Sequence, residues 1–209
     1  SLNRLLGRQV AEKWAEAVGV NMKTEDVDNA GPLAVAPTRE EVLVAAFVVY
    51  RHKHVGWDTA KQLAAQAYNQ ADKEMIPPFG AVLLAGVSET LHSLKNRGFK
   101  TALATTDSHE RANVSLKKLG IGSCFDVVVG ADDVENGKPA PDMILKACKL
   151  AGCAPCDAVM VGDSASDMLM AKNARVKLCI GVLGGLASKE TLKKNADVVV
   201  PSVTSLRVA

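Results

Sequence analysis

From about residue 85 onward, short apolar runs alternate with amphipathic helical segments, and this alternation constrains the fold more than any other feature of the chain. Parallel strands need crossover connections, and short buried apolar runs are typical of strands that are covered on both faces. The pattern therefore predicts an α/β fold built on a doubly wound parallel sheet. The expected strands are 101–105, 125–129, 158–161, 176–182 and 198–200.

The part of the chain before residue 77 has helical periodicity instead. Apolar residues recur at three- and four-residue steps over 2–18, and another helix is expected from Asp58. Between them, Thr38-Arg39-Glu40-Glu41 has the form of a capping box. The run Val42–Tyr50 that follows fits either a helix or a buried strand, and the cap favours the helix.

The boundary between the two parts is marked by Pro77-Pro78-Phe79-Gly80, because prolines and glycine end helices and are common in links between domains. We therefore expect a helical domain over residues 1–80 and an α/β core over residues 81–209. We see no internal repeat and no low-complexity segment.

Composition and charge exclude several kinds of partner. The net charge of the 209 residues is only +2, which implies no strong attraction to nucleic acid or to a membrane surface. No apolar run reaches the roughly 18 residues that a membrane span needs. Five cysteines, an odd number in a chain that needs no disulfides for stability, favour a reducing compartment such as the cytoplasm. We expect a monomer or a homodimer. The chain begins at Ser1 without an initiator Met, so a preceding segment, with or without organelle targeting, is left open.

Polar residues follow the predicted strands at the edge where ligands bind in parallel sheets. Thr105-Thr106-Asp107 places hydroxyl groups before a helix whose free N–H groups could hold a phosphate. The loop Gly137–Asp142 presents Lys138, a compact positive charge suited to a phosphate oxygen or to a carboxylate. The plain alternatives are helix capping for the threonines and a solvated loop position for the lysine.

Two carboxylates, Asp163 and Asp167, follow the predicted strand 158–161 at a spacing of four residues. Carboxylate oxygens are ligands for a hard cation such as Mg²⁺, which also keeps several waters. Since two unpaired carboxylates repel each other, the arrangement makes most sense with a cation or a lysine between them. The plain alternative is a strand–helix turn with ordinary caps.

Taken in this order, these motifs resemble the haloacid dehalogenase superfamily of phosphatases, and within it the phosphoglycolate-phosphatase-like branch that carries a helical cap domain. The matching stretches are Leu103–Asp107, Gly137–Pro141 and Val161–Asp167. The likeness extends from about Leu84 to the end of the chain. The resemblance implies that the helical domain is the cap and that the second part is the catalytic core.

The resemblance also implies a role for each residue. Thr105 would hydrogen-bond the transferring phosphoryl group, with Thr106 beside it in the substrate site. Lys138 would neutralise charge between phosphate and nucleophile. Asp163 would bind Mg²⁺, and Asp167 would support that metal site directly, through water or by holding Lys138. The implied reaction is the hydrolysis of a small phosphorylated metabolite, a phosphate monoester, through an aspartyl-phosphate intermediate.

One departure from the family is large, because its nucleophile motif, Asp-x-Asp-Gly at the end of the first and central strand, has no clear counterpart. Asp26-Val27-Asp28 has the spacing but follows a polar run, so a loop or capping cluster is the better interpretation. We expect the nucleophile upstream of Ser1. The sheet would then have a gap in its middle that another segment, or the run Val42–Tyr50, would have to fill.

Two other functions stay open. The chain could be an inactive relative that binds a phosphorylated ligand or a protein partner, or a phosphomutase of the same fold. The pair Cys153 and Cys156 has the spacing of a redox dithiol but lies in a loop before a strand, whereas redox pairs usually begin a helix. Its role is left open as well.

Overall fold

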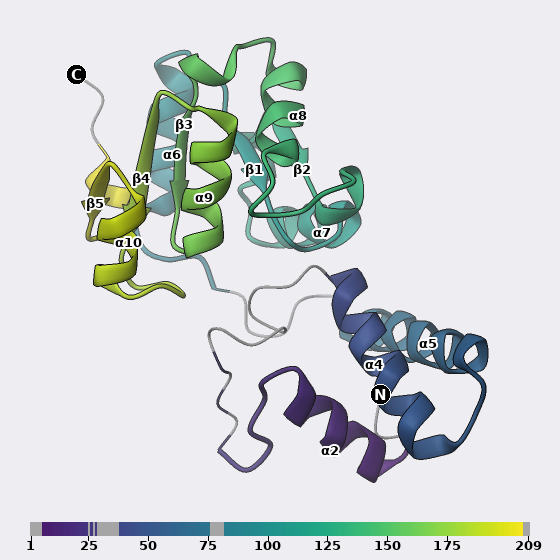
Figure 1. The fold of residues 1–209 in the computed structure, drawn as a ribbon. Helices are drawn as coiled ribbons and strands as arrows, with labels where there is room; N and C mark the ends of the chain where they lie inside the picture. Colours follow the sequence, from purple (N-terminus) through teal and green to yellow (C-terminus); the bar gives the residue numbers. More distant parts are fainter. Residues whose placement is uncertain (1–5, 25, 27, 29–37, 76–81, 207–209) are drawn as a thin grey trace. The chain divides into compact units, whose positions relative to one another are not determined.

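The computed structural model describes residues 6–24, 26, 28, 38–75 and 82–206, and it divides the chain into two compact units (Figure 1). The first unit is Ser1–Phe79 and the second is Gly80–Ala209. Each unit has a hydrophobic core of its own. None of the helices in the described part of the chain combines the length and the apolarity that a membrane crossing requires.

The first unit is helical in its described residues. Its helices are α2 (Arg8–Ala17), α4 (Thr38–Lys53) and α5 (Trp57–Met75). The facing surfaces of α4 and α5 are rich in buried alanines, which let the helix backbones approach closely. The preference for a helix over Val42–Tyr50 is thus confirmed. Buried side chains at 45, 46 and 49 follow the helical period, whereas a strand would bury alternate residues.

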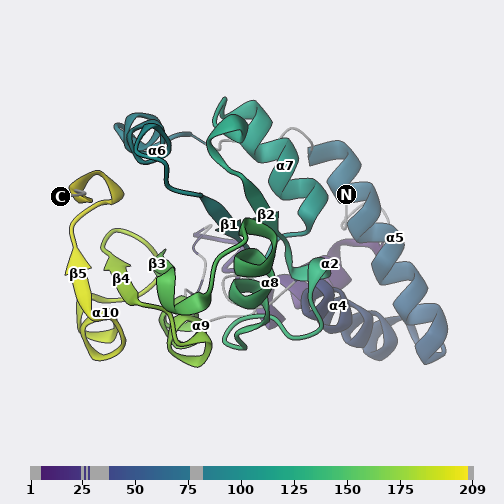
Figure 2. The same ribbon diagram turned by 90° about the horizontal axis from the view of Figure 1, so that it is seen from above.

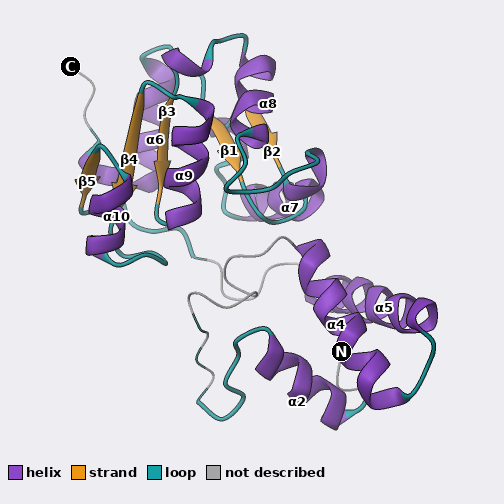
Figure 3. Cartoon of the chain, viewed as in Figure 1, coloured by secondary structure: helices purple, strands orange, loops and turns teal. Residues whose placement is uncertain are grey.

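Among its described residues, the second unit contains five short strands, all paired in parallel. They form two sheets among the described residues, one two-stranded and one three-stranded (Figure 3). The first sheet is β1 (Ala102–Ala104) beside β2 (Val127–Val129). The second has the order β3 (Val159–Gly162), β4 (Leu178–Val182) and β5 (Val198–Val200).

Helices cover these strands on both sides. Seen along the strands, α8, α9 and α10 lie on one side, and α6 and α7 lie on the other (Figure 2). Their bounds are α6 Val87–Asn96, α7 His109–Lys118, α8 Asp142–Ala151, α9 Ala165–Ala174 and α10 Lys189–Asn195. Single 3₁₀ turns complete the unit, namely η1 Gly122–Cys124, η2 Ala131–Asp133, η3 Pro155–Asp157 and η4 Val203–Ser205. The predicted fold class, a doubly wound parallel α/β unit preceded by helices, is confirmed.

One hydrophobic cluster joins the two sheets. Side chains from α8, α9 and α10 pack together against β2 and β4, and their largest fully buried members are Met143, Met168, Met170, Leu192 and Val129. Among the described residues, however, β1 pairs only with β2, and β3 only with β4 and not with β1. Each therefore keeps one edge without a strand partner. The run Val42–Tyr50 does not take that position, because it is part of helix α4 in the first unit.

The fully buried Leu192 tests how far this cluster stabilises the second unit. We expect Leu192→Ala to lower the free energy of unfolding by about 2–5 kcal/mol, since it removes buried methyl groups and leaves a cavity. Leu150→Ala, at a side chain on α8 that is 60% exposed, should change it by less than about 0.5 kcal/mol. Urea denaturation followed by circular dichroism measures both changes. Tryptophan fluorescence would not report on the second unit, because both tryptophans, Trp14 and Trp57, lie in the first unit. Equal effects would contradict this packing.

Candidate functional site

The carboxyl end of β1 leads directly into the start of α7. The amide of Thr105 donates to the carbonyl of Val129 at 3.0 Å, which continues the β1–β2 pairing by one residue. The Thr105 hydroxyl then accepts a hydrogen bond from the Asp107 amide at 3.1 Å, and Ser108 caps α7. Thr106 lies between them and is half-buried. Both predicted threonines therefore lie where the sheet ends and a helix amino terminus begins.

Lys138 reaches this strand end from the loop before α8. Its side chain is only 10% exposed, and its ammonium donates to the carbonyl of Ala104 at 2.9 Å. The same nitrogen lies 2.7 Å from Oδ1 of Asp167. The loop is held in place at its base, because the backbone and side-chain amides of Asn136 both donate to Asp142 in the first turn of α8. The solvated position that was the plain alternative for Lys138 is therefore wrong.

Asp167 is buried in the first turn of α9, where its two oxygens have different partners. Oδ2 accepts hydrogen bonds from the Ser164 amide at 3.2 Å and from the Ser164 hydroxyl at 2.7 Å. The Asp167 amide in turn donates to the Ser164 hydroxyl at 3.1 Å, and this bond forms a capping box with the bond from the Ser164 amide. Apart from the ion pair with Lys138, Oδ1 has no hydrogen-bond partner. Gly162 makes this arrangement possible, since a Cβ there would lie 2.6–2.8 Å from atoms of the Asp167 side chain.

Asp163 is the first residue after β3, and the connection between β4 and α10 lies over it. Its Oδ2 accepts from the Leu186 amide at 3.2 Å, and its carbonyl accepts from the Ala187 amide at 2.9 Å. Gly185 passes so close that a Cβ at that position would be 1.8 Å from Oδ2. The connection between β4 and α10, distant in sequence, thus fixes the orientation of this half-buried carboxylate.

The structure therefore brings the three predicted motifs to one edge of the second unit. Lys138 connects Ala104, the residue before Thr105, with Asp167, and Asp167 is hydrogen-bonded to Ser164, the residue after Asp163. No group of three or more His, Cys, Asp and Glu side chains converges as a metal site within the described ranges. Asp163 and Asp167 offer two carboxylates to a cation, but both oxygens of Asp167 already have partners, namely Lys138 and Ser164.

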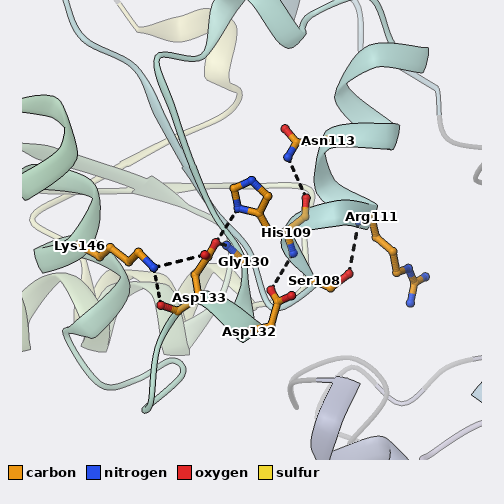
Figure 4. Close-up of polar contacts among 8 residues, drawn as sticks. All are labelled: Ser108, His109, Arg111, Asn113, Gly130, Asp132, Asp133 and Lys146. Carbon is orange, nitrogen blue, oxygen red and sulfur yellow. Dashed lines mark hydrogen bonds and ion pairs between the residues drawn. The ribbon is translucent and has the colours of Figure 1, made fainter. Parts of the chain in front are cut away.

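Sequence reasoning missed a second polar network beside this edge (Figure 4). Asp133, which follows β2, accepts from the Gly130 amide at 2.9 Å and lies 2.6 Å from Nδ1 of His109 and 3.3 Å from Nζ of Lys146. Burial acts to raise the pKa of Asp133, but the Gly130 amide, His109 and Lys146 together hold it below its usual value. Asp132 accepts from the His109 amide at 2.7 Å.

This network ties the start of α7, the helix that follows Thr105, to the end of β2 and to α8. Gly130 is required there, because a Cβ would lie 2.3 Å from the His109 amide nitrogen. A signal was present in the sequence, since Asp132-Asp133 is a second pair of acids directly after a predicted strand. What the sequence did not show was that His109 and Lys146 would meet them.

Comparison with known proteins agrees with this geometry. A sequence model of the family described as haloacid dehalogenase-like hydrolase matches residues 13–181. The chain belongs to this family. The matched residues include most of the helical unit and most of the α/β unit described above.

Curated relatives of this chain include proteins named pyrophosphatase PpaX. The one from Halalkalibacterium halodurans is 35% identical over 144 residues, which are 69% of this chain and 57% of that protein. The one from Bacillus velezensis is 41% identical over 106 residues, or 51% of this chain and 49% of that protein. The chain thus spans about half the length of the curated relatives it matches.

Solved structures support the fold. A haloacid dehalogenase-like hydrolase from Bacteroides fragilis superposes with a TM-score of 0.72 at 20% identity, covering 94% of this chain and 89% of that one. A structure described as a phosphoglycolate phosphatase from Haemophilus somnus gives 0.66 at 18% identity, with 94% and 90% covered. At these identities the likeness concerns the fold alone.

Replacing only one partner of the ion pair between Lys138 and Asp167 should strongly destabilise the second unit. We expect Lys138→Met to lower the free energy of unfolding by about 3–5 kcal/mol, because Asp167 is left charged and buried. Lys138→Met combined with Asp167→Asn should recover part of this loss. Lys13→Met, which breaks a surface pair with Glu16, should leave the urea midpoint unchanged. A loss that the double variant does not reduce would count against the buried pair.

Gly185 offers a test of how Asp163 is positioned. We expect Gly185→Ala to destabilise the second unit by about 1–3 kcal/mol, since the new methyl group overlaps the Asp163 carboxylate and must displace it. Gly122→Ala is the matched control, because its Cβ would meet Leu116 at an ordinary 3.8 Å. Thermal unfolding of both variants measures the difference. An unchanged midpoint for Gly185→Ala would show that the loop does not press on Asp163.

Proposed function

We propose that this hydrolase transfers a phosphoryl group from a small phosphate monoester to water, with Mg²⁺ and through an aspartyl-phosphate. The single observation that carries the proposal is the position of Lys138, whose ammonium lies between the strand end of Thr105 and the buried Asp167. A buried lysine held at the carboxyl ends of parallel strands is suited to the charge of a transferring phosphoryl group. Membership in the hydrolase family agrees with that chemistry.

Each predicted residue then has a role that its contacts allow. The Thr105 hydroxyl, fixed by the Asp107 amide, can donate its proton to a phosphoryl oxygen, and Thr106 lies beside it at the start of the helix. Lys138 neutralises negative charge on that phosphoryl group. Of the three roles considered for Asp167, holding Lys138 agrees best with a distance of 2.7 Å and with the capping bonds of its other oxygen.

The residues present fit a Mg²⁺ ion through Asp163. Mg²⁺ prefers oxygen ligands, and in phosphoryl-transfer sites one or two carboxylates suffice, since water and substrate oxygens supply the rest. Asp163 is half-buried at the strand end, and one of its oxygens is oriented by the Leu186 amide. When bound, the ion would neutralise charge on the phosphate. Asp167 would act on that site through Lys138.

The nucleophile requires a further inference about the chain. Asp26 and Asp28 belong to the first unit, where the carbonyl of Asp26 and the amide of Asp28 bond to Asn21 and Gly19. We infer instead that the nucleophilic aspartate lies upstream of Ser1, on a strand that pairs with the open edges of β1 and β3. This inference is supported by the pairing pattern, in which both strands keep one edge without a partner among the described residues.

Two alternative functions are compatible with the same site. Pyrophosphate is a candidate substrate beside a monoester, because several relatives are named pyrophosphatases. Binding of a phosphorylated ligand without turnover is the other candidate, because Lys138, Asp167 and Asp163 are all present without the nucleophile motif.

A hydrolysis assay tests the proposal. It compares the present chain with a chain that is extended by the coding sequence upstream of Ser1. With p-nitrophenyl phosphate or pyrophosphate and Mg²⁺, we expect turnover by the extended chain and a rate on the order of 10⁴-fold lower for the present one. Asp163→Asn should abolish the Mg²⁺-dependent turnover, whereas Asp157→Asn, at an exposed acid on η3, should not.

The outcomes separate the alternatives. Full turnover by the present chain would place the nucleophile within residues 1–209 and overturn the upstream strand. Binding of phosphate and Mg²⁺ by both chains with no turnover by either would favour the inactive relative. Neither binding nor turnover would overturn the proposed function.

A further inference from the structure

Three cysteines lie together in sequence where α8 ends and β3 is approached, away from the strand ends that carry the candidate site. Cys148 is in the last turn of α8 and is 5% exposed. Cys153 and Cys156 follow the helix and are both exposed, and all three are free thiols. The sequence pairs Cys153 with Cys156 by their spacing, but in the structure the backbone of Cys153 is hydrogen-bonded to Cys148.

The end of α8 is a Schellman motif in which both contact positions are cysteines. Gly152 is left-handed at φ 74°, its amide bonds to Lys149, and the Cys153 amide donates to the Cys148 carbonyl at 3.0 Å. In this motif the residue after the glycine usually makes an apolar contact with the residue that accepts its amide bond. Here both of these positions are occupied by cysteines, Cys148 and Cys153.

The backbone bond also limits the distance between these residues. The donor nitrogen is one bond from the Cα of Cys153, and the acceptor oxygen is two bonds from the Cα of Cys148. The two Cα atoms therefore lie within roughly 7 Å, the limit for a disulfide without backbone movement. Burial, with a smaller contribution from the Cys153 thiol, raises the pKa of Cys148 to about 11.

We propose that Cys148 and Cys153 are an oxidisable dithiol that a small disulfide of the glutathione class converts into an intramolecular disulfide across the end of α8. The exposed Cys153 thiolate attacks the small disulfide, forms a mixed disulfide and releases one thiolate. The Cys148 sulfur then attacks the Cys153 sulfur, forms the internal bond and releases the second thiolate. Two protein thiols are oxidised, one small disulfide is reduced to two thiols, and the two protons pass to them.

Cys156 is the competing partner, and the local structure favours it less. Pro155 separates it from Cys153 and begins the 3₁₀ turn η3, which directs the chain onward toward β3. No backbone hydrogen bond between Cys153 and Cys156 is present in this described connection, whereas the amide of Cys153 is bonded directly to Cys148. Closure onto Cys148 therefore needs less rearrangement of the backbone.

Peptide mapping of the folded full chain tests the proposal. After oxidised glutathione and alkylation of remaining thiols, trypsin cleaves behind Lys146, Lys149 and Lys172. A bond between Cys148 and Cys153 then links peptide 147–149 to peptide 150–172. A bond between Cys153 and Cys156 stays within the second peptide and lightens it by two hydrogen atoms. We expect the linked pair in the unmodified chain and in Cys156→Ser, and its complete loss in Cys153→Ser.

Both variants change exposed side chains, so a failure to fold does not confuse the result. Cys179 is the internal control, because burial also raises its pKa to about 11 while its sulfur contacts Met168 and no cysteine. Alkylation of Cys179 under the same conditions would mean that unfolding exposes Cys148, and would overturn the proposal. A bond confined to peptide 150–172, or only a mixed disulfide on Cys153, would overturn it as well.

Discussion

The second unit depends on one buried ion pair. Its strands form two separate sheets, and the ammonium of Lys138 contacts the last residue of β1 in one sheet and Asp167, on the helix that follows β3, in the other. Both side chains are at most 10% exposed, so neither charge is well solvated and each needs the other. The same pairing that holds the strand ends together therefore also places a positive charge at the edge where parallel sheets bind ligands.

Close approach of backbone is the second constraint, and it explains three glycines. Gly162, Gly185 and Gly130 each lie where a Cβ would overlap a carboxylate or an amide that belongs to a polar cluster. At Gly162 and Gly185 the space is taken by Asp167 and Asp163, so the two acids face different backbone donors and do not compete for one. The charge repulsion that two neighbouring carboxylates would suffer is relieved by a lysine on one of them and by a backbone amide on the other.

Much of the fold could be read from local pattern, because strands and helices differ in the period of their buried residues. The run 198–200 was predicted with the bounds of β5, and the other four strands were displaced by one or two residues at their ends. Tertiary contacts could not be predicted in this way. Nothing near Lys138 in the sequence indicates Ala104, and nothing near His109 indicates Asp133 or Lys146. Such pairs are set by which strand ends become neighbours, which periodicity does not specify.

Strand direction connects the open edges to the chemistry. The ammonium of Lys138 contacts both the last residue of β1 and Asp167, on the helix that follows β3, so the carboxyl ends of β1 and β3 both lie near Lys138. A strand that joined the two edges in the same direction would also end there. Any acid placed directly after it would meet the ammonium of Lys138 from a third side, with Thr105 and Asp163 on the neighbouring strands. In the proposed reaction, the lysine that joins the two sheets would thus also neutralise the negative charge of the nucleophile.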